Sequence, residues 1–97
     1  MKPLLFVSVI IPCRNEEKFI AKCLDSIINN DYPKENLEIS IIDGMSDDKT
    51  RQIVQEYEYK YPFIKILDNF DTITPKAFNI GIQQAKGEII LILNFVQ

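Results

Sequence analysis

Side chains that could bind a small ligand lie just after apolar segments of this 97-residue chain. Asp43 directly follows the apolar segment 37–42, and Asn15 and Glu16 come shortly after the segment 6–12. Carboxylates at the ends of strands accept hydrogen bonds from the ribose of nucleotides in doubly wound folds. We therefore expect a ligand site where the strands end. The candidates are Asn15, Glu16, Asp43, Asp47, Asp48, Asp68 and Asn79.

Each candidate also has an ordinary structural use, because Asn, Asp and Glu cap helices and form turns. Asp47 and Asp48 suit the first turn of a helix, where the helix dipole favours negative charge. Asp43 differs, because it ends an apolar segment and precedes Gly44. A glycine there allows a special backbone angle or the close approach of a ligand. Asp43 is therefore the candidate that a turn or cap explains least well.

Several catalytic sites are excluded by composition. The chain has no histidine, so a serine-histidine triad is absent, and Cys13 has no base to make it a nucleophile, although a nearby helix start would lower its pKa. The three glycines, Gly44, Gly81 and Gly87, cannot form the dinucleotide fingerprint or the Walker phosphate loop. We expect Cys13 and Cys23 to be reduced, with Cys23 in the core.

Size and charge indicate one small domain. The chain is 46% hydrophobic and 26% charged, with a formal net charge of -3 and no cluster of Lys and Arg. Nucleic-acid binding needs a basic stripe, so we expect no nucleic-acid partner, whereas a small anionic ligand remains compatible. The longest apolar runs are too short to span a bilayer, and neither a signal peptide nor an anchor is visible. We expect a cytoplasmic protein.

The segment 6–12 organises the rest of the chain. It is rich in β-branched residues and nearly continuous in apolar character, which is typical of a central strand buried on both faces. Pro12 cannot donate to a neighbouring strand and fits the strand's end. Asn15 is expected to cap the following helix, with Glu16 and Glu17 near the helix's positive end.

Strands and helices alternate along the remaining sequence. Apolar residues spaced three or four apart predict a helix over 16–29 and another that carries Ile53, Val54, Tyr57 and Tyr61 on one side. Strands are predicted at 37–42, 63–67 and 88–93. Thr74 and Pro75 predict a helix start, with the hydroxyl of Thr74 at the cap, and that helix should run to Lys86, with Gly87 as a left-handed terminator.

Four strands alternating with three helices predict an open, parallel α/β sheet with three right-handed crossover helices. The expected strand order is 3-2-1-4. In this order the chain changes its direction of travel between the first and fourth strands, and such sheets bind ligands at that point, outside the carboxyl ends of the strands. Residues 12–15 and Asn94 should therefore face a common crevice.

Three sequence motifs together resemble the amino-terminal half of family 2 glycosyltransferases. They are VSVIIP (7–12) with RNEE (14–17), IDGMSDDKT (42–50), and AFNIGI (77–82) with AKGE (85–88). The resemblance covers nearly the whole chain. It implies the GT-A fold, in which this chain is a Rossmann-like half, and inverting transfer of a sugar from a nucleotide-diphospho-sugar, UDP-sugar above all, to a carbohydrate or lipid acceptor in polysaccharide or cell-envelope synthesis.

The resemblance also implies site residues. It places Pro12, Cys13, Arg14 and Glu16 in the loop that holds the nucleoside, and Asp43 against the base or ribose. Many relatives have a second acid at the position of Gly44 and an arginine at the position of Phe78. A cationic contact would therefore have to come from Lys76, while Asn79 and Gly81 match the family pattern.

A metal-binding motif differs from the pattern. Relatives follow the fourth strand with Asp-x-Asp, whose carboxylates hold Mg²⁺ or Mn²⁺ on the diphosphate. Here the segment reads Asn94-Phe95-Val96. We expect a single nucleotide-sugar-binding domain over 1–97, a truncated glycosyltransferase that binds no metal alone. The complete enzyme would use Mg or Mn, in the cytoplasm or at the inner face of the membrane.

Two alternatives remain at this point. The chain could be a non-catalytic binding or scaffold module that pairs through its fourth strand, because an unpaired apolar edge at 89–93 invites a partner, including a second copy in a homodimer. It could also be a receiver-like or other small α/β domain with acidic strand ends.

Overall fold

The strands lie in the order β3-β2-β1-β4, all parallel, as the sequence predicts. Their bounds are Val7–Cys13 (β1), Leu37–Asp43 (β2), Ile64–Asp68 (β3) and Ile89–Ile92 (β4). This computed structural model describes residues 4–95, so Val96 lies outside the described residues. In register, Cys13 pairs with Asp43, which pairs with Asp68. The polar ends of these three strands therefore lie side by side.

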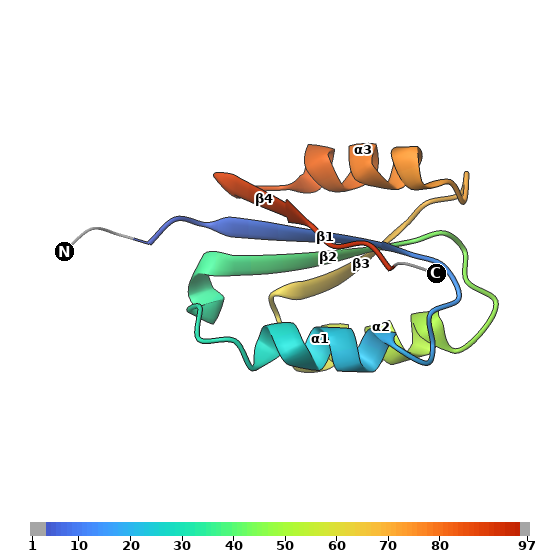
Figure 1. The fold of residues 1–97 in the computed structure, drawn as a ribbon, viewed down its shortest axis with the longest axis horizontal. Helices are drawn as coiled ribbons and strands as arrows, with labels where there is room; N and C mark the ends of the chain where they lie inside the picture. Colours follow the sequence, from blue (N-terminus) through green and yellow to red (C-terminus); the bar gives the residue numbers. More distant parts are fainter. Residues whose placement is uncertain (1–3, 96–97) are drawn as a thin grey trace.

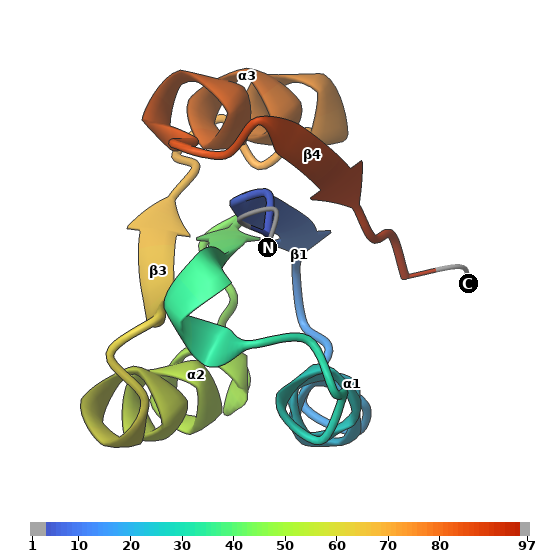
Figure 2. The same ribbon diagram turned by 90° about the vertical axis from the view of Figure 1, so that its left-hand side faces the viewer.

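Helices cover both faces of the sheet (Figure 1). Helices α1 (Ile20–Ile28) and α2 (Thr50–Lys60) lie on one face and α3 (Thr74–Gln84) on the other, as Figure 2 shows end-on. A short 3₁₀ turn, η1 (Lys34–Asn36), leads into β2. This arrangement is the open α/β sheet with three crossover helices that was predicted.

Side chains alternate between two cores because successive strand residues point to opposite faces. Leu24 of α1 and Val54 of α2 join the larger core with Val9, and Ile10 packs with Ala77 of α3 in the smaller one. The larger core also contains Val7, Ile11, Cys13, Ile20, Leu37, Ile39, Ile41 and Ile64. Cys23 is half-buried against it, and both cysteines are free thiols.

The start of α1 differs from the prediction. The helix begins at Ile20 after Phe19, with no side-chain cap, and Asn15 does not cap it. Asn15 adopts φ 53°, and its side-chain oxygen accepts a hydrogen bond from the backbone N–H of Asp47 at 2.9 Å. The prediction was wrong because the amide of Asn15 serves the neighbouring loop, 32 residues away in sequence.

The ends of α3 also differ. Ile73 occupies the N-cap position and Thr74 is already helical, so Thr74 is not the cap, while Pro75 lies in the first turn as predicted. The helix ends at Gln84, not at Lys86, and no glycine has a positive φ. Gly87 is needed for space, because a Cβ there would lie 2.7 Å from the backbone nitrogen of Ser8.

Strand β1 ends one residue later than predicted, at Cys13, so Pro12 is its penultimate residue. The carbonyl of Ile10 accepts a hydrogen bond from the backbone N–H of Leu93, so the backbone polar groups of Ile10 face β4. In a strand these groups face alternate neighbours from one residue to the next, so those of Pro12 also face the β4 side. Strand β4 pairs with β1 only as far as Ile10 opposite Ile92. The missing N–H of Pro12 therefore falls beyond the end of β4, where no strand needs it.

Strand β4 is an edge strand whose side chains remain open to solvent. The four apolar residues of β4 and Leu93, which follows it, are 38–50% exposed: Ile89, Ile90, Leu91, Ile92 and Leu93.

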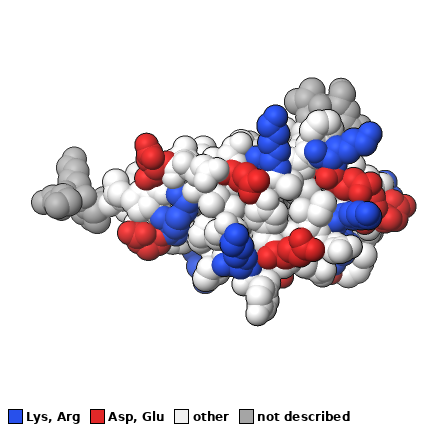
Figure 3. Space-filling view, turned by 90° about the horizontal axis from the view of Figure 1, so that it is seen from below, with Lys and Arg blue, Asp and Glu red and all other residues white. Residues whose placement is uncertain are grey.

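On the α1–α2 face of the molecule, acidic and basic side chains are interspersed (Figure 3). Within residues 4–95, no helix has the length and apolar character needed to cross a membrane.

Candidate functional site

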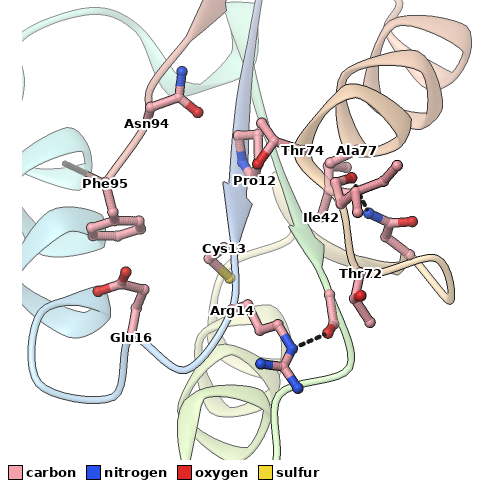
Figure 4. Close-up of a pocket in the computed structure, with 13 residues that line it drawn as sticks. Pro12, Cys13, Arg14, Glu16, Ile42, Thr72, Thr74, Ala77, Asn94 and Phe95 are labelled. Atoms are coloured by element: carbon pink, nitrogen blue, oxygen red, sulfur yellow. Dashed lines mark hydrogen bonds between the residues drawn. The ribbon is translucent and has the colours of Figure 1, made fainter. Parts of the chain in front are cut away.

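A pocket of about 140 Å³ lies at the carboxyl ends of the strands (Figure 4). Glu16 and Phe95 stand on one side of it, and Thr72 and Thr74 stand on the other. Its lining comes from the last residues of β1 and β2, the segments after β1, β2, β3 and β4, and the start of α3: Pro12, Cys13, Arg14, Glu16, Ile42, Gly44, Asn69, Thr72, Ile73, Thr74, Ala77, Asn94 and Phe95.

The pocket brings together most of the predicted site. Pro12, Cys13, Arg14 and Glu16 all line it, and so does Asn94. Asp43, Lys76 and Asn79 are not in the lining. Lys76 and Asn79 are exposed on α3, while Asp43 is completely buried.

The carboxylate of Asp43 is held by the protein's own donors. Its Oδ2 accepts hydrogen bonds from the backbone of Ser46 at 2.9 Å and from Arg51 at 2.8 Å. Its Oδ1 accepts from the Ser46 hydroxyl at 2.5 Å and from the Cys13 thiol at 3.7 Å. Arg51 also pairs with Asp68 at 2.7 Å. Asp43 thus ties β1, β2, β3 and α2 together beneath the pocket.

Hydrogen bonds also join the loops after β1 and β2. The backbone N–H of Asn15 donates to the Ser46 hydroxyl at 2.8 Å, and that of Glu16 donates to the Thr50 hydroxyl at 2.8 Å. The N–H of Glu17 donates to Asp48 at 3.3 Å. Together with the bond from Asp47 to Asn15, these contacts run in both directions between the loops. The loops therefore form one framework.

Arg14 is positioned by Gly44. The Nε of Arg14 donates to the Gly44 carbonyl at 3.0 Å. A Cβ on Gly44 would lie 3.5 Å from the Cβ and Cδ of Arg14 and 3.4 Å from the Cα of Thr72. Gly44 therefore lies between Arg14 and Thr72 in the pocket wall, where any side chain would fill the space between them.

The thiol of Cys13 is unreactive in this setting. Burial, followed by the negative charge of Asp43 and the hydrogen bond to it, raises the pKa of Cys13 far above its usual range. The lowered pKa expected from a nearby helix start is wrong, because α1 begins seven residues later and a carboxylate lies beside the sulfur. Cys13 lines the pocket as a neutral thiol.

Sequence reasoning missed the contribution of the loop after β3. Asn69 is buried, donates from its side chain to the Ile73 carbonyl at 2.8 Å and accepts from the N–H of Asp71 at 3.2 Å. Asn69 thereby shapes a turn that places Thr72 and Ile73 in the pocket wall. The available signal was Asn at the start of a polar segment, which is a common turn residue.

Residues 8–94 match the family described as glycosyl transferase family 2. The chain belongs to glycosyl transferase family 2. This membership and the GT-A architecture confirm the predicted resemblance.

Curated relatives of this family 2 chain are glycosyltransferases. It is 49% identical over 89 residues to the dolichyl N-acetyl-alpha-D-glucosaminyl phosphate 3-beta-D-2,3-diacetamido-2,3-dideoxy-beta-D-glucuronosyltransferase of Methanococcus voltae, covering 90% of this chain and 28% of that protein. It is 35% identical to the poly(ribitol-phosphate) beta-N-acetylglucosaminyltransferase TarS of Staphylococcus aureus, covering 90% of this chain and 15% of TarS.

Solved structures agree with the fold. The mannosyltransferase PcManGT of Pyrobaculum calidifontis, in complex with GDP-Man and Mn²⁺, has a TM-score of 0.86 and 30% identity, covering 93% of this chain and 27% of that one. S. aureus TarS in complex with UDP-GlcNAc has a TM-score of 0.81 and 35% identity, covering 91% and 26%. The family 2 chain therefore spans about a quarter of the length of these structures.

The described residues do not fit a metal site. Among residues 4–95, no group of three or more His, Cys, Asp and Glu side chains could hold a metal ion. Asn94 brings one neutral amide oxygen to the pocket, where a hard divalent cation bound to a diphosphate is usually held by carboxylates.

Proposed function

We propose that this chain is the nucleotide-binding part of an inverting glycosyltransferase that uses a nucleotide-diphospho-sugar, UDP-sugar above all. The observation that carries the proposal is the pocket where Pro12, Cys13, Arg14 and Glu16 converge at the carboxyl ends of β1 and β2. Open α/β sheets bind nucleotides at this place. The similar structures hold UDP-GlcNAc and GDP-Man, which supports a nucleotide ligand.

The residues present would bind and orient the donor. Ile73, which is 52% exposed in the lining, offers apolar surface to a planar base, and Arg14 offers N–H donors. Asp43 would act from beneath the pocket by holding Ser46 and the thiol of Cys13. Lys76 and Asn79, which are exposed on α3 outside the lining, stay predictions for contacts that the longer protein would complete.

The wider activity is part of the same proposal. By analogy with the relatives, the acceptor is a carbohydrate or a lipid, and the role lies in polysaccharide or cell-envelope synthesis, in the cytoplasm or at the inner face of the membrane. A metal, Mg or Mn, would be held by carboxylates that this chain lacks among its described residues. When bound, it would neutralise the diphosphate leaving group.

Titration calorimetry with UDP and GDP tests the proposal. We expect UDP to bind, and Arg14→Ala to weaken binding roughly tenfold or more, because charge-assisted hydrogen bonds are lost. Lys22→Ala is the control, since Lys22 is exposed on α1 and outside the pocket. Adding Mn²⁺ or Mg²⁺ should leave the affinity unchanged. Failure of the parent chain to bind either nucleotide would refute the proposal, and a metal-dependent gain would refute its metal part.

A second candidate function is pairing with another chain through β4, a homodimer being the simplest case. It is supported by the exposure of Leu91, 50%, and of its neighbours along an unpaired edge. Sedimentation of Leu91→Lys against Tyr59→Lys tests it, because Tyr59 is 95% exposed on α2, away from that edge. A dimer lost only in Leu91→Lys supports pairing, and a monomeric parent chain excludes the homodimer.

A further inference from the structure

Thr72 has a backbone conformation that its side chain disfavours. Its φ is 61°, in the left-handed region, where a β-branched residue is an outlier. Thr72 lies in the loop between β3 and α3 and lines the pocket at the carboxyl ends of the strands. Such outliers cluster at ligand sites, where the surrounding structure determines them.

The surrounding loop holds Thr72 in place. Its backbone N–H donates to the Asn69 carbonyl at 3.2 Å, and the N–H of Asn69 donates to the Asp43 carbonyl at 2.8 Å. The Asn69 side chain fixes the next residue through the Ile73 carbonyl at 2.8 Å. Thr72 is therefore bracketed by bonds that run back to the sheet.

Between residues 4 and 95, two other non-glycine residues have a positive φ, Asn15 at 53° and Met45 at 58°. Asn tolerates this region, and the side chain of Asn15 is bonded to Asp47. Met45 does not line the pocket. Thr72 alone among these three combines β-branching, a place in the pocket wall, and an exposed side chain whose hydroxyl is open to a ligand and takes part in no hydrogen bond between residues 4 and 95.

We propose that Thr72 is a nucleoside-binding residue of this pocket, whose hydroxyl hydrogen-bonds the base or ribose. The inference rests on the proposed nucleotide-binding function. A hydroxyl can both donate and accept, which suits base carbonyls and ribose hydroxyls. Ile73, the next residue, is 52% exposed in the same pocket wall and offers apolar surface to a planar base, while Ile42 and Ala77 behind it are buried. Figure 4 shows Thr72 on the same side of the pocket as Ala77.

Glycine at position 72 would relieve the backbone strain at no steric cost, and asparagine would relieve most of it. Threonine at this position therefore adopts a backbone conformation that its side chain disfavours and that the hydrogen bonds of the loop hold. A ligand contact made by the hydroxyl would account for a threonine here. Serine would keep the hydroxyl and remove the branch, whereas valine would keep the branch and remove the hydroxyl, so the two variants separate binding from backbone conformation.

The experiment measures affinity for UDP, uridine and pyrophosphate, together with urea midpoints, for Thr72→Ser, Thr72→Val and Thr72→Gly. Thr72→Ser should bind UDP and uridine as the parent does. Thr72→Val should lose roughly 3- to 10-fold for both, with pyrophosphate unaffected. Thr72→Gly should show the same loss with a raised urea midpoint. Met45→Gly is the matched control, with a raised midpoint and unchanged UDP affinity.

Unchanged uridine affinity in Thr72→Val overturns the inference, and so does an equal loss of affinity in Met45→Gly. A loss confined to pyrophosphate also overturns it, because the contact would then be to phosphate. If Thr72→Val does not fold, Thr72→Ser and Thr72→Gly decide the question by their difference in uridine affinity. A parent chain that binds none of the three probes refutes the proposed function itself, which is a separate result.

Discussion

The two strands beside β1 in the sheet, β2 and β4, differ in their burial and in the hydrogen bonds that follow them. All seven residues of β2 are buried, whereas all four residues of β4 are exposed. The loop after β2 is joined to the loop after β1 by side-chain and backbone hydrogen bonds, and the carboxylate of Asp43 lies beneath both. After β4, Asn94 and Phe95 reach the pocket without such a framework among the described residues.

This contrast separates two tasks. The β2 side fixes the geometry of the pocket, because its polar groups are bonded within the chain. The β4 side carries exposed apolar surface, which is typical of a site of interaction. Under the proposed function, nucleotide recognition would depend mainly on the loops after β1, β2 and β3, while β4 would offer apolar surface to a partner.

The largest expected effect compares a leucine of the core with a leucine of β4. Leu24 in α1 is completely buried and Leu91 in β4 is 50% exposed. Leu24→Ala should lower the free energy of unfolding by about 2–5 kcal/mol, and Leu91→Ala by under about 1 kcal/mol, because only the first leaves a cavity. Urea denaturation of both variants checks this. Similar midpoint shifts would mean that β4 is buried as well, and the contrast would fail.

A smaller effect is expected from the carboxylate beneath the loops. Asp43→Ala should cost about 1–3 kcal/mol of stability, because Ser46 and Arg51 lose their shared acceptor. It should also weaken UDP binding by loosening the loops. Asp47→Ala, at an exposed position, should change stability by less than about 0.5 kcal/mol. Paired urea and calorimetric titrations measure both effects, and an Asp43→Ala variant as stable as the parent would show that the network contributes little.

The smallest effect is a pH dependence on the β2 side. Burial and Asp43 raise the pKa of Cys13, so the folded state keeps a proton that the unfolded chain releases above about pH 8.5. This stabilisation is complete below pH 8.5 and is lost as pH rises. The free energy of unfolding should fall between about pH 8.5 and 10, and Cys13→Ala should flatten that slope. Cys23→Ala should flatten it less, because Cys23 is only half-buried. An identical slope in Cys13→Ala and the parent chain would contradict the assignment.

Tyr57 affects the pH dependence of stability only at higher pH, so it does not obscure the effect of Cys13 between about pH 8.5 and 10. Burial and the hydrogen bond to Asp25 raise the pKa of Tyr57 to about 12. Its stabilising effect begins to be lost above about pH 10, the usual value for tyrosine.

The strands and their order were predictable because β-branched runs and right-handed crossovers leave few alternatives. The pocket residues Pro12, Cys13, Arg14 and Glu16 followed from the motif that they share with the family. Contacts distant in sequence were not predictable. Asn15 looked like a helix cap because its local sequence permits one, yet its partner is Asp47.

Gly87 and Thr72 also depend on contacts that the sequence could not predict. Gly87 follows a helix, and only the folded sheet reveals that Ser8 leaves no room for a side chain. The left-handed backbone of Thr72 depends on Asn69, whose buried position is set by its bond to the end of β2. Local propensity favours glycine or asparagine where φ is positive, so no sequence rule would have selected a threonine.

The bonds between the loops after β1 and β2 also set how these loops can move. Asn15, Glu16 and Asp47 each donate a backbone N–H to the opposite loop. An amide exchanges its hydrogen with water only when its bond opens, and here one bond cannot open far without displacing the segment that holds the others. These amides should therefore exchange together, as one opening unit.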